Sequence, residues 1–433
     1  MNSVVIDHVI RPADPRQLDT RRPAAWRRAL RFVGPGYIIA VGYMDPGNWA
    51  TDVGGGSACG YSLLSVVLLS SLMAMLLQAA AVRLGLASGM DLAQACRHHF
   101  TAPVNYALWV GCEIAVVACN LAEVLGMACG LGLLFHIPLI AGVLIATADV
   151  MLILRLQRGG MRYLEALIIA LIALIAACFA LQLWWLRPSL TEVAAGFVPT
   201  SGFLTQPQML YLAVGIMGAT VMPHNLYLHS SIVKARRLEP GKDGIRRSIR
   251  YATTDSNVAL ALAFFVNVGI LVLAAGAFHH PDGPSRTLGL TEAHRLLSPV
   301  LGTSVAGIIF GGALVASGLS SSITGTMAGQ IVVEGFLDLR MSPGKRALLS
   351  RALAIVPAVA VTAWLGSEGA GKLLVLSQVI LGLQLPFAVV PLLWFTTRRR
   401  YLGDHAFTRS TAGLLWVIAA VLIVTNLWVL YEI

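Results

Sequence analysis

Residues 44–48 read MDPGN and lie inside an apolar stretch that is long enough to form a membrane helix. Pro46 has no backbone N–H and its ring clashes with the preceding turn, so we expect the helix to break here and to free backbone carbonyl groups. Asp45 places a carboxylate at the same depth. An unpaired charge there costs about 2.5–3.5 kcal/mol on insertion scales. The pattern therefore predicts a partner for Asp45, and a bound cation would be one.

A second break is predicted at residues 222–225, which read MPHN inside another apolar stretch. Interrupted segments at corresponding positions in two halves of a chain are typical of a transporter site near the bilayer midplane. Met222 immediately precedes the helix-breaking Pro223, so its thioether is expected at the depth of Asp45. A methionine in an apolar stretch is usually core filler, and its position at the break favours a ligand role instead.

The donor types at the two breaks indicate which cation would fit. The carboxylate of Asp45, the amide oxygen of Asn48 and the sulfur of Met222 together favour a divalent first-row metal over Ca²⁺ or Mg²⁺, which prefer all-oxygen shells. Carbonyl groups freed near Gly42 and Ala219 are expected to complete the shell with water. The simpler alternatives are that Asp45 and Asn48 only cap the helix that begins beside them.

Several further polar residues lie in apolar stretches and indicate proton movement. His224 and His229 follow the second break, but a spacing of five residues puts them about 140° apart on a helix, so they should not ligate one metal together. Glu113, Asn120 and Glu123 share one helical stripe, which predicts either a proton relay or a buried network of ion pairs. The ion-pair alternative would involve one of two arginines, Arg346 or Arg351.

Other polar residues give weaker signals. Gln378, in the tenth apolar stretch, is expected to reach the cation site. Asp52 precedes three glycines and is expected to line the outer mouth. Four acidic residues near the ends of the stretches are expected to be interfacial or helix-capping groups, namely Asp149, Glu165, Asp255 and Glu334.

The composition indicates a polytopic membrane protein. Of the 433 residues, 57% are hydrophobic and only 12% are charged, with a mean hydropathy of +0.75. A soluble domain usually has about 25% charged residues. The net charge is +10, but the basic residues lie between apolar stretches rather than on one helix face, so no nucleic-acid partner is expected. The six cysteines form no C-x-x-C pair and are expected to be packing residues.

Eleven stretches approach the roughly 20 residues that a membrane-crossing helix needs. They are 36–56, 61–86, 107–131, 138–154, 163–185, 209–233, 252–277, 302–333, 348–365, 371–395 and 412–430. The eighth looks too long for a straight crossing, so we expect it to tilt or to extend beyond the membrane.

The distribution of Lys and Arg predicts the topology. With residues 1–31 as a cytosolic tail, 27 of the 31 basic residues fall on the inside. The four on the outside are Arg187, Arg286, Arg295 and Lys372. We therefore expect one transmembrane domain over 32–433 with the N-terminus inside and the C-terminus outside. Its parts would be two inverted repeats, 36–185 and 209–395, and an extra helix, 412–430.

These motifs resemble those of the Nramp family, the natural resistance-associated macrophage proteins. The resemblance covers nearly the whole chain after Arg31. It is carried by DPGN at 45–48, MPHNLYLHS at 222–230, SITGTMAGQ at 322–330 and SQVILGLQLPFA at 377–388. It implies an all-α fold of the LeuT type and proton-coupled transport of Mn²⁺ or Fe²⁺.

The resemblance also implies roles for single residues. Asp45, Asn48 and Met222 would bind the metal, with the Ala219 carbonyl and, in some states, Gln378. Glu123, His224 and neighbouring charged groups would move protons. Met222 also separates this chain from magnesium-transporting relatives that lack the sulfur.

One departure from the family pattern affects the proton route. The family usually has Thr-Asp-Leu-Ala-Glu in its third helix, whereas residues 119–123 here read CNLAE. The amide of Asn120 cannot carry a proton near neutral pH. We therefore expect proton coupling to be weaker, rerouted or absent.

The sequence thus predicts a monomeric secondary transporter of the inner, or plasma, membrane. It would import Mn²⁺ or Fe²⁺ by alternating access with a proton, and it would need no resident cofactor. The main alternative is a symporter for a small organic substrate such as an amino acid, with Asp45 receiving the amino group. A channel and a membrane metalloenzyme are less favoured. The chain contains no H-E-x-x-H or comparable cluster, so no enzymatic activity is expected.

Overall fold

The fold is described from a computed structural model that covers residues 34–149, 152, 155, 161–200, 202, 206–235, 241–280, 286–339 and 342–432. The predicted tail, 1–31, and part of the fourth apolar stretch lie outside these residues. All regular structure in the described part of the chain is helical. The prediction of an all-α protein is confirmed.

The first half of the chain contains α3 (Pro35–Gly42), α4 (Pro46–Cys59), η1 (Gly60–Leu63), α5 (Leu64–Ser88), α6 (Leu92–His99), α7 (Ala102–Phe135), α8 (Leu139–Thr147), α10 (Met161–Leu186) and α11 (Leu190–Gly196). The second half contains α13 (Pro207–Val221), α14 (Pro223–Ile232), η2 (Val233–Ala235), α15 (Lys242–Phe278), α16 (Leu290–Leu301), α17 (Val305–Leu337), α18 (Pro343–Thr396), α19 (Arg399–Leu402), η3 (Gly403–His405) and α20 (Arg409–Glu432).

Most helices follow the predicted apolar stretches, but two stretches are each split into two helices and two others are merged into one. The stretches at 36–56 and 209–233 are each split into two helices, α3 with α4 and α13 with α14. The stretches at 348–365 and 371–395 run together as α18, with a kink at Gly366, whose φ is 62°. Eight helical segments of the described residues are long and apolar enough to cross a membrane. The count of eleven crossings stays a prediction.

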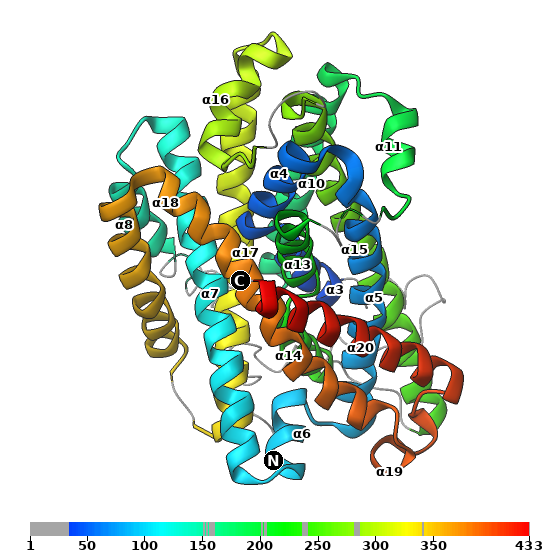
Figure 1. Ribbon diagram of the computed structural model, residues 1–433. Helices are drawn as coiled ribbons and strands as arrows, with labels where there is room; N and C mark the ends of the chain where they lie inside the picture. The colour runs from blue at the N-terminus through cyan, green and yellow to red at the C-terminus, as the bar shows by residue number, and fades with distance from the viewer. Residues whose placement is uncertain are drawn as a thin grey trace.

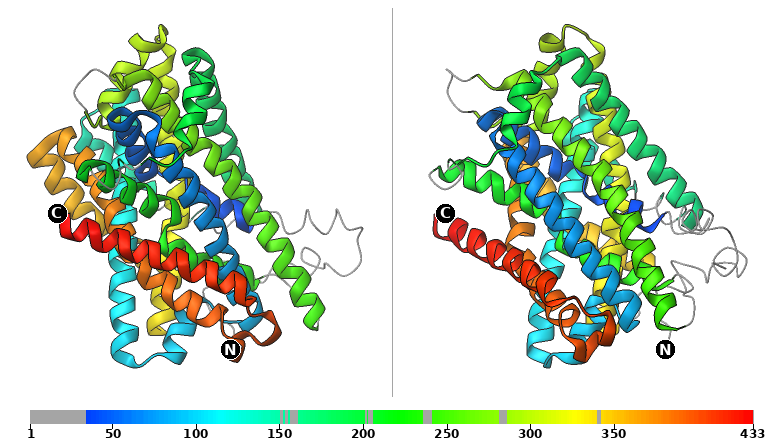
Figure 2. Two further views of the ribbon diagram at one scale, coloured as in Figure 1. Left: turned by 45° about the vertical axis from the view of Figure 1, so that its right-hand side comes forward. Right: turned by 90° about the vertical axis from the view of Figure 1, so that its right-hand side faces the viewer.

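The interrupted helices occupy the centre of the bundle (Figures 1 and 2). On one side α3 and α4 pack against α15, and on the other α4 contacts α7 and α18, while α13 packs against α18, α4 and α5. In the apolar window of the α13–α14 segment 94% of the residues are buried, against 28% for α10 and 33% for α20. The central segments are thus enclosed by other helices, whereas α10 and α20 expose apolar faces suited to lipid.

Three contacts with neighbouring helices fix the ends of the central helices. The Asp255 carboxylate on α15 accepts a hydrogen bond from the N–H of Gly36 at 2.8 Å, so Asp255 caps the start of α3, as predicted for an acidic residue near a segment end. Beyond the end of α14, Lys234 pairs with Asp91 at the start of α6, with 2.6 Å between Nζ and Oδ2. The N–H of Leu92 also donates to Ser230 Oγ at 3.0 Å.

The last helix lies obliquely across the outside of the bundle (Figures 1 and 2). α20 packs against α18, α13 and α5. Its buried Asn426 donates to the carbonyl of Gly382 on α18 at 2.8 Å. α20 therefore braces the helices that surround the centre and contributes no residue to the break regions.

Candidate metal site

The first break spans residues 43–45, between the end of α3 and the start of α4. Asp45 has extended backbone angles and is the N-cap of α4, with its Oδ1 accepting from the N–H of Asn48 at 2.7 Å. The capping role that the sequence offered as the simpler alternative is therefore present. It uses only one oxygen. Asp45 is fully buried, and its Oδ2 has no hydrogen-bond partner among the described residues.

The backbone carbonyls freed at the first break are held by donors from three helices. Tyr43 O accepts from Asn267 Nδ2 on α15 at 2.9 Å. Met44 O accepts from Trp49 Nε1 on α4 at 3.0 Å and from Ser317 Oγ on α17 at 2.5 Å. A buried carbonyl left without a donor would cost about 1–3 kcal/mol, so these contacts fix the path of the unwound segment.

The second break consists of one residue. Met222 separates α13 from α14 and has φ 42° and ψ 96°, an unusual conformation for a residue with a side chain. Pro223 begins α14 at a position where the missing N–H is not needed. Asn225 Nδ2 donates to the Met222 sulfur at 3.3 Å and so orients the thioether.

The two breaks meet at Asn48. Its Nδ2 lies 2.8 Å from Asp45 Oδ1, 3.1 Å from the Ala219 carbonyl and 3.5 Å from the Gly42 carbonyl. Three oxygens from both interrupted helices thus converge on one electropositive group. A half-turn of the amide would point its oxygen at the same place, where a cation would then replace the N–H donors.

The Met222 sulfur lies beside this group of oxygens. A Cβ atom added to Gly42 would lie 3.3 Å from Met222 Sδ and 2.5 Å from Asn225 Nδ2. Only glycine therefore lets the end of α3 approach the second break this closely. That Asp45 and Met222 ligate one cation stays a prediction.

Gln378 on α18 covers the same region from a third side. A Cβ atom at Gly47, between Asp45 and Asn48, would overlap the Gln378 side chain. Gln378 is fully buried, and its Oε1 has no hydrogen-bond partner within the described ranges. This amide oxygen joins Asp45 Oδ2 as an unsatisfied acceptor close to the convergence point.

Unsatisfied acceptors rather than donors predominate at the convergence point, which is what a cation requires. The described residues contain no cluster of three or more His, Cys, Asp or Glu side chains arranged to hold a metal. The available donors are instead carboxylate, amide, carbonyl and thioether groups. That mixture suits a first-row divalent metal better than Ca²⁺ or Mg²⁺.

A chain of hydrogen bonds leads away from the breaks to a histidine that was predicted to handle protons. Tyr43 Oη donates to Val221 O at 3.4 Å and accepts from Gln78 Nε2 at 2.8 Å. Gln78 Oε1 lies 2.8 Å from His229 Nδ1. The sequence analysis did not single out Tyr43 or Gln78. Gln78 had a usable signal, because it is the one glutamine in the apolar stretch at 61–86.

His224 and Glu123, two further candidates for proton movement, lie on different helices, α14 and α7. His224 is buried and neither ring nitrogen has a hydrogen-bond partner among the described residues. Glu123 is buried on α7, where Cys119 Sγ donates to its Oε1 at 3.5 Å, and it faces Gly325 on α17. The buried Asn120 lies one turn before it.

Glu113 is engaged elsewhere, near the start of α18. Its carboxylate forms an ion pair with Arg346, which also donates to the Gly329 carbonyl at 3.2 Å. This is the ion pair that the sequence offered as the alternative to a proton role. The structure joins Glu113 to the surrounding helices and does not bring it to the breaks.

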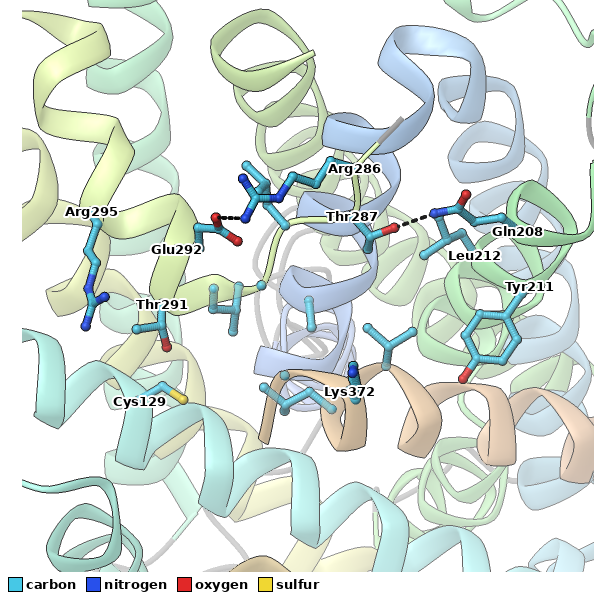
Figure 3. A pocket seen from close by; sticks show the side chains of 17 residues that line it. Cys129, Gln208, Tyr211, Leu212, Arg286, Thr287, Thr291, Glu292, Arg295 and Lys372 are labelled. Atoms are coloured by element: carbon cyan, nitrogen blue, oxygen red, sulfur yellow. Dashed lines mark hydrogen bonds and ion pairs between the residues drawn. The ribbon is translucent and has the colours of Figure 1, made fainter. Parts of the chain in front are cut away.

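A cavity of about 730 Å³ lies beside the first half of α4 (Figure 3). Its wall includes Ala50, two residues after Asn48, and Val375, about one turn before Gln378. Gln208 donates to Thr287 Oγ1 at 2.8 Å at its rim, and Arg286 pairs with Glu292 at 2.7 Å. The cavity thus ends within about a helical turn of the convergence point.

Comparison with known proteins identifies the family. The family model described as natural resistance-associated macrophage protein-like matches residues 36–432. The chain belongs to the Nramp family. The resemblance inferred from the motifs is therefore confirmed over almost the whole transmembrane region.

Relatives of this Nramp protein are transporters rather than enzymes. The divalent metal cation transporter MntH of Bradyrhizobium diazoefficiens is 55% identical over 407 residues, which cover 94% of this chain and 90% of the relative. The divalent metal cation transporter MntH of a Nostoc species is 51% identical over 407 residues, covering 94% and 92%. These relatives favour the metal alternative over an organic substrate.

Solved structures agree with the architecture. A manganese transporter of Eremococcus coleocola superimposes with a TM-score of 0.84 at 36% identity, covering 94% of this chain and 88% of the other. MhsT, in complex with L-phenylalanine, superimposes at 0.63 with 15% identity, covering 92% and 98%, and so shares the fold alone. This Nramp chain is an integral membrane protein with a LeuT-like fold.

Proposed function

We propose that this Nramp protein imports Mn²⁺ or Fe²⁺ across the inner membrane by alternating access, with movement of a proton. The observation that carries the proposal is the convergence of Asp45 Oδ1, Gly42 O and Ala219 O on one point beside the Met222 sulfur. Oxygen and sulfur donors from both interrupted helices would then bind one cation. Movement of either helix would change its coordination.

In this mechanism each break contributes ligands to one metal ion and also acts as a hinge. Asp45, Asn48, Met222 and the Ala219 carbonyl would bind the metal, with Gln378 and the Gly42 carbonyl contributing in some states. Membrane potential supplies about 2.3 kcal/mol per charge per 100 mV for inward movement of a cation, so uptake does not depend on tight proton coupling. The protein would act as a monomer without a resident cofactor, with its N-terminus inside and C-terminus outside.

Uptake of Mn²⁺ into proteoliposomes tests the proposal. Asp45→Ala removes the only carboxylate at the breaks, so uptake should fall to the level of empty liposomes while the variant still elutes as a folded protein. Asp404→Ala is the matched control, because the Asp404 side chain is 67% exposed in η3 and should leave uptake unchanged. Wild-type uptake in Asp45→Ala would exclude the site.

A further inference from the structure

Asp52 is a buried carboxylate to which the transport mechanism above gives no role. The sequence placed it at an outer mouth, but the structure buries it, with 2% of its surface exposed. Its Oδ2 has no hydrogen-bond partner among the described residues. A carboxylate in such a position is costly in a membrane protein, and this cost points to a function.

Asp52 and Asp45 lie on one face of α4. Seven residues separate them, which is two helical turns and a rise of about 10 Å. Over such a distance inside a protein, a change of charge at one carboxyl group acts on the other. Asp52 lies two residues after Ala50, the α4 residue that lines the cavity, and about 200° around the helix from it. It therefore lies beyond the convergence point along α4, on a different face of the helix from the cavity wall.

The surroundings of Asp52 favour a proton over a second metal ion. A divalent metal needs several donors, and no cluster of three acidic, histidine or cysteine side chains occurs in the described part of the chain. A proton needs only one oxygen. A buried carboxylate without a cationic partner binds a proton readily.

No described basic group pairs with Asp52. The helices packed against α4 include α7, α13, α15, α16, α17 and α18. The charged residues of α15 belong to its first half, up to Asp255, and that of α17 is near its last turn. The other described titratable side chains of these helices include Glu113 and Glu123 on α7, Glu292, His294 and Arg295 on α16, and Arg346 and Lys372 on α18. Asp52 Oδ2 accepts no hydrogen bond from any of them in the described part of the chain.

We propose that Asp52 is the proton-binding group coupled to the metal at Asp45, in a chain where Asn120 cannot serve. Binding of a divalent cation changes the charge at Asp45 from about −1 to +1, and over about 10 Å this change disfavours the proton on Asp52. The O–H bond of the Asp52 carboxyl then breaks, the proton passes to water, and the carboxylate remains. The proposal rests on metal binding at Asp45 and adds the group that releases a proton in response to that binding.

The first test follows both ions in proteoliposomes that hold a pH-sensitive dye. Asp52→Asn keeps the shape of the side chain and removes the proton site. We expect Mn²⁺ uptake to persist and the number of protons moved per Mn²⁺ to fall at least about fivefold. An unchanged ratio would overturn the proposal, and so would a wild-type protein that moves no protons. Asp45→Ala reports separately on the metal site, so failure of one idea does not imply failure of the other.

A second measurement covers the case in which Asp52→Asn does not fold. Purified full-length protein in weakly buffered detergent is titrated with Mn²⁺ over a range of pH, and proton release is recorded. Asp52→Glu keeps a carboxyl group but moves it along the helix, so the pH midpoint of release should shift. The exposed carboxylate variant Asp404→Asn is the control and should match the wild type. A midpoint that is the same in Asp52→Glu and wild type contradicts the assignment.

Discussion

Both helix breaks contribute groups to the same convergence point, but they are held in place differently. The first break is three residues long, and its carbonyls are held from outside by Asn267 and Ser317 on neighbouring helices. The second is the single residue Met222 in a strained conformation. Its neighbouring carbonyls, at Ala219 and Val221, accept from side chains of the first interrupted segment.

This difference implies that the conformation of the second break depends on that of the first. The first break is fixed by the surrounding bundle, whereas the second is fixed partly by the first. A change at the first break should therefore disturb both, and a change at the second should chiefly alter what the site selects. Four substitutions test this comparison, from the largest expected effect to the smallest.

Gly42→Ala should have the largest effect. The added methyl would lie 2.5 Å from Asn225 Nδ2 and 3.3 Å from the Met222 sulfur, so the two breaks could no longer approach. We expect Mn²⁺ uptake to fall more than about tenfold, with about 1–3 kcal/mol lost from stability by overpacking. Gly312→Ala on α17 is the control, since a methyl there would meet nothing within 4 Å. Equal uptake in the two variants would contradict the close approach.

Met222→Ala should change selectivity more than rate. Loss of the sulfur leaves an oxygen-rich shell that accepts Ca²⁺ more readily, so Mn²⁺ transport should continue while Ca²⁺ competes better, by about an order of magnitude. Competition of Ca²⁺ with Mn²⁺ uptake measures this. Unchanged discrimination between the two ions would refute the role of the sulfur.

Asn267→Ala should lower both stability and uptake by moderate amounts. It leaves the Tyr43 carbonyl without its donor, at a cost of about 1–3 kcal/mol. Asn426→Ala is a matched control, because Asn426 is also buried and also donates from Nδ2 to a backbone carbonyl, that of Gly382. Thermal unfolding in detergent should show similar losses for both, and only Asn267→Ala should slow Mn²⁺ uptake. A similar loss of uptake in Asn426→Ala would mean that the effect is merely one of stability.

Tyr43→Phe should have the smallest effect. The hydrogen bond to Val221 O is long, at 3.4 Å, so the second break loses little, and the stability cost of about 1–3 kcal/mol arises mainly because Gln78 Nε2 loses its acceptor. We expect Mn²⁺ uptake to fall by less than about threefold. A loss as large as that of Gly42→Ala would show that the second break depends on Tyr43 far more than on the close approach at Gly42.

The sequence predicted the parts of this site that depend on local chemistry. Pro46 and Pro223 break helices wherever they occur within them, so both interruptions could be placed to within a few residues. The donor set followed from the residues beside them. The family assignment rested on the same motifs.

What the sequence did not predict depends on contacts between distant segments. The choice for Glu113 between a relay and an ion pair was settled only by the arrival of Arg346 from a residue 233 positions away. The role of Gln78 depends on Tyr43 and His229 meeting across three helices. The burial of Asp52 depends on how tightly α15 packs on α4. Periodicity gives the face of a helix but not its neighbour.

The link between α14 and α6 constrains how the C-terminal end of α14 can move. Lys234 forms an ion pair with Asp91, and Ser230 Oγ accepts a hydrogen bond from the N–H of Leu92. The C-terminal end of α14 therefore cannot move alone without breaking these contacts. It must carry α6 with it, and with α6 the connection between α5 and α7. In the proposed transport mechanism, α14 and α6 would therefore move as one unit, joined by contacts remote from the convergence point.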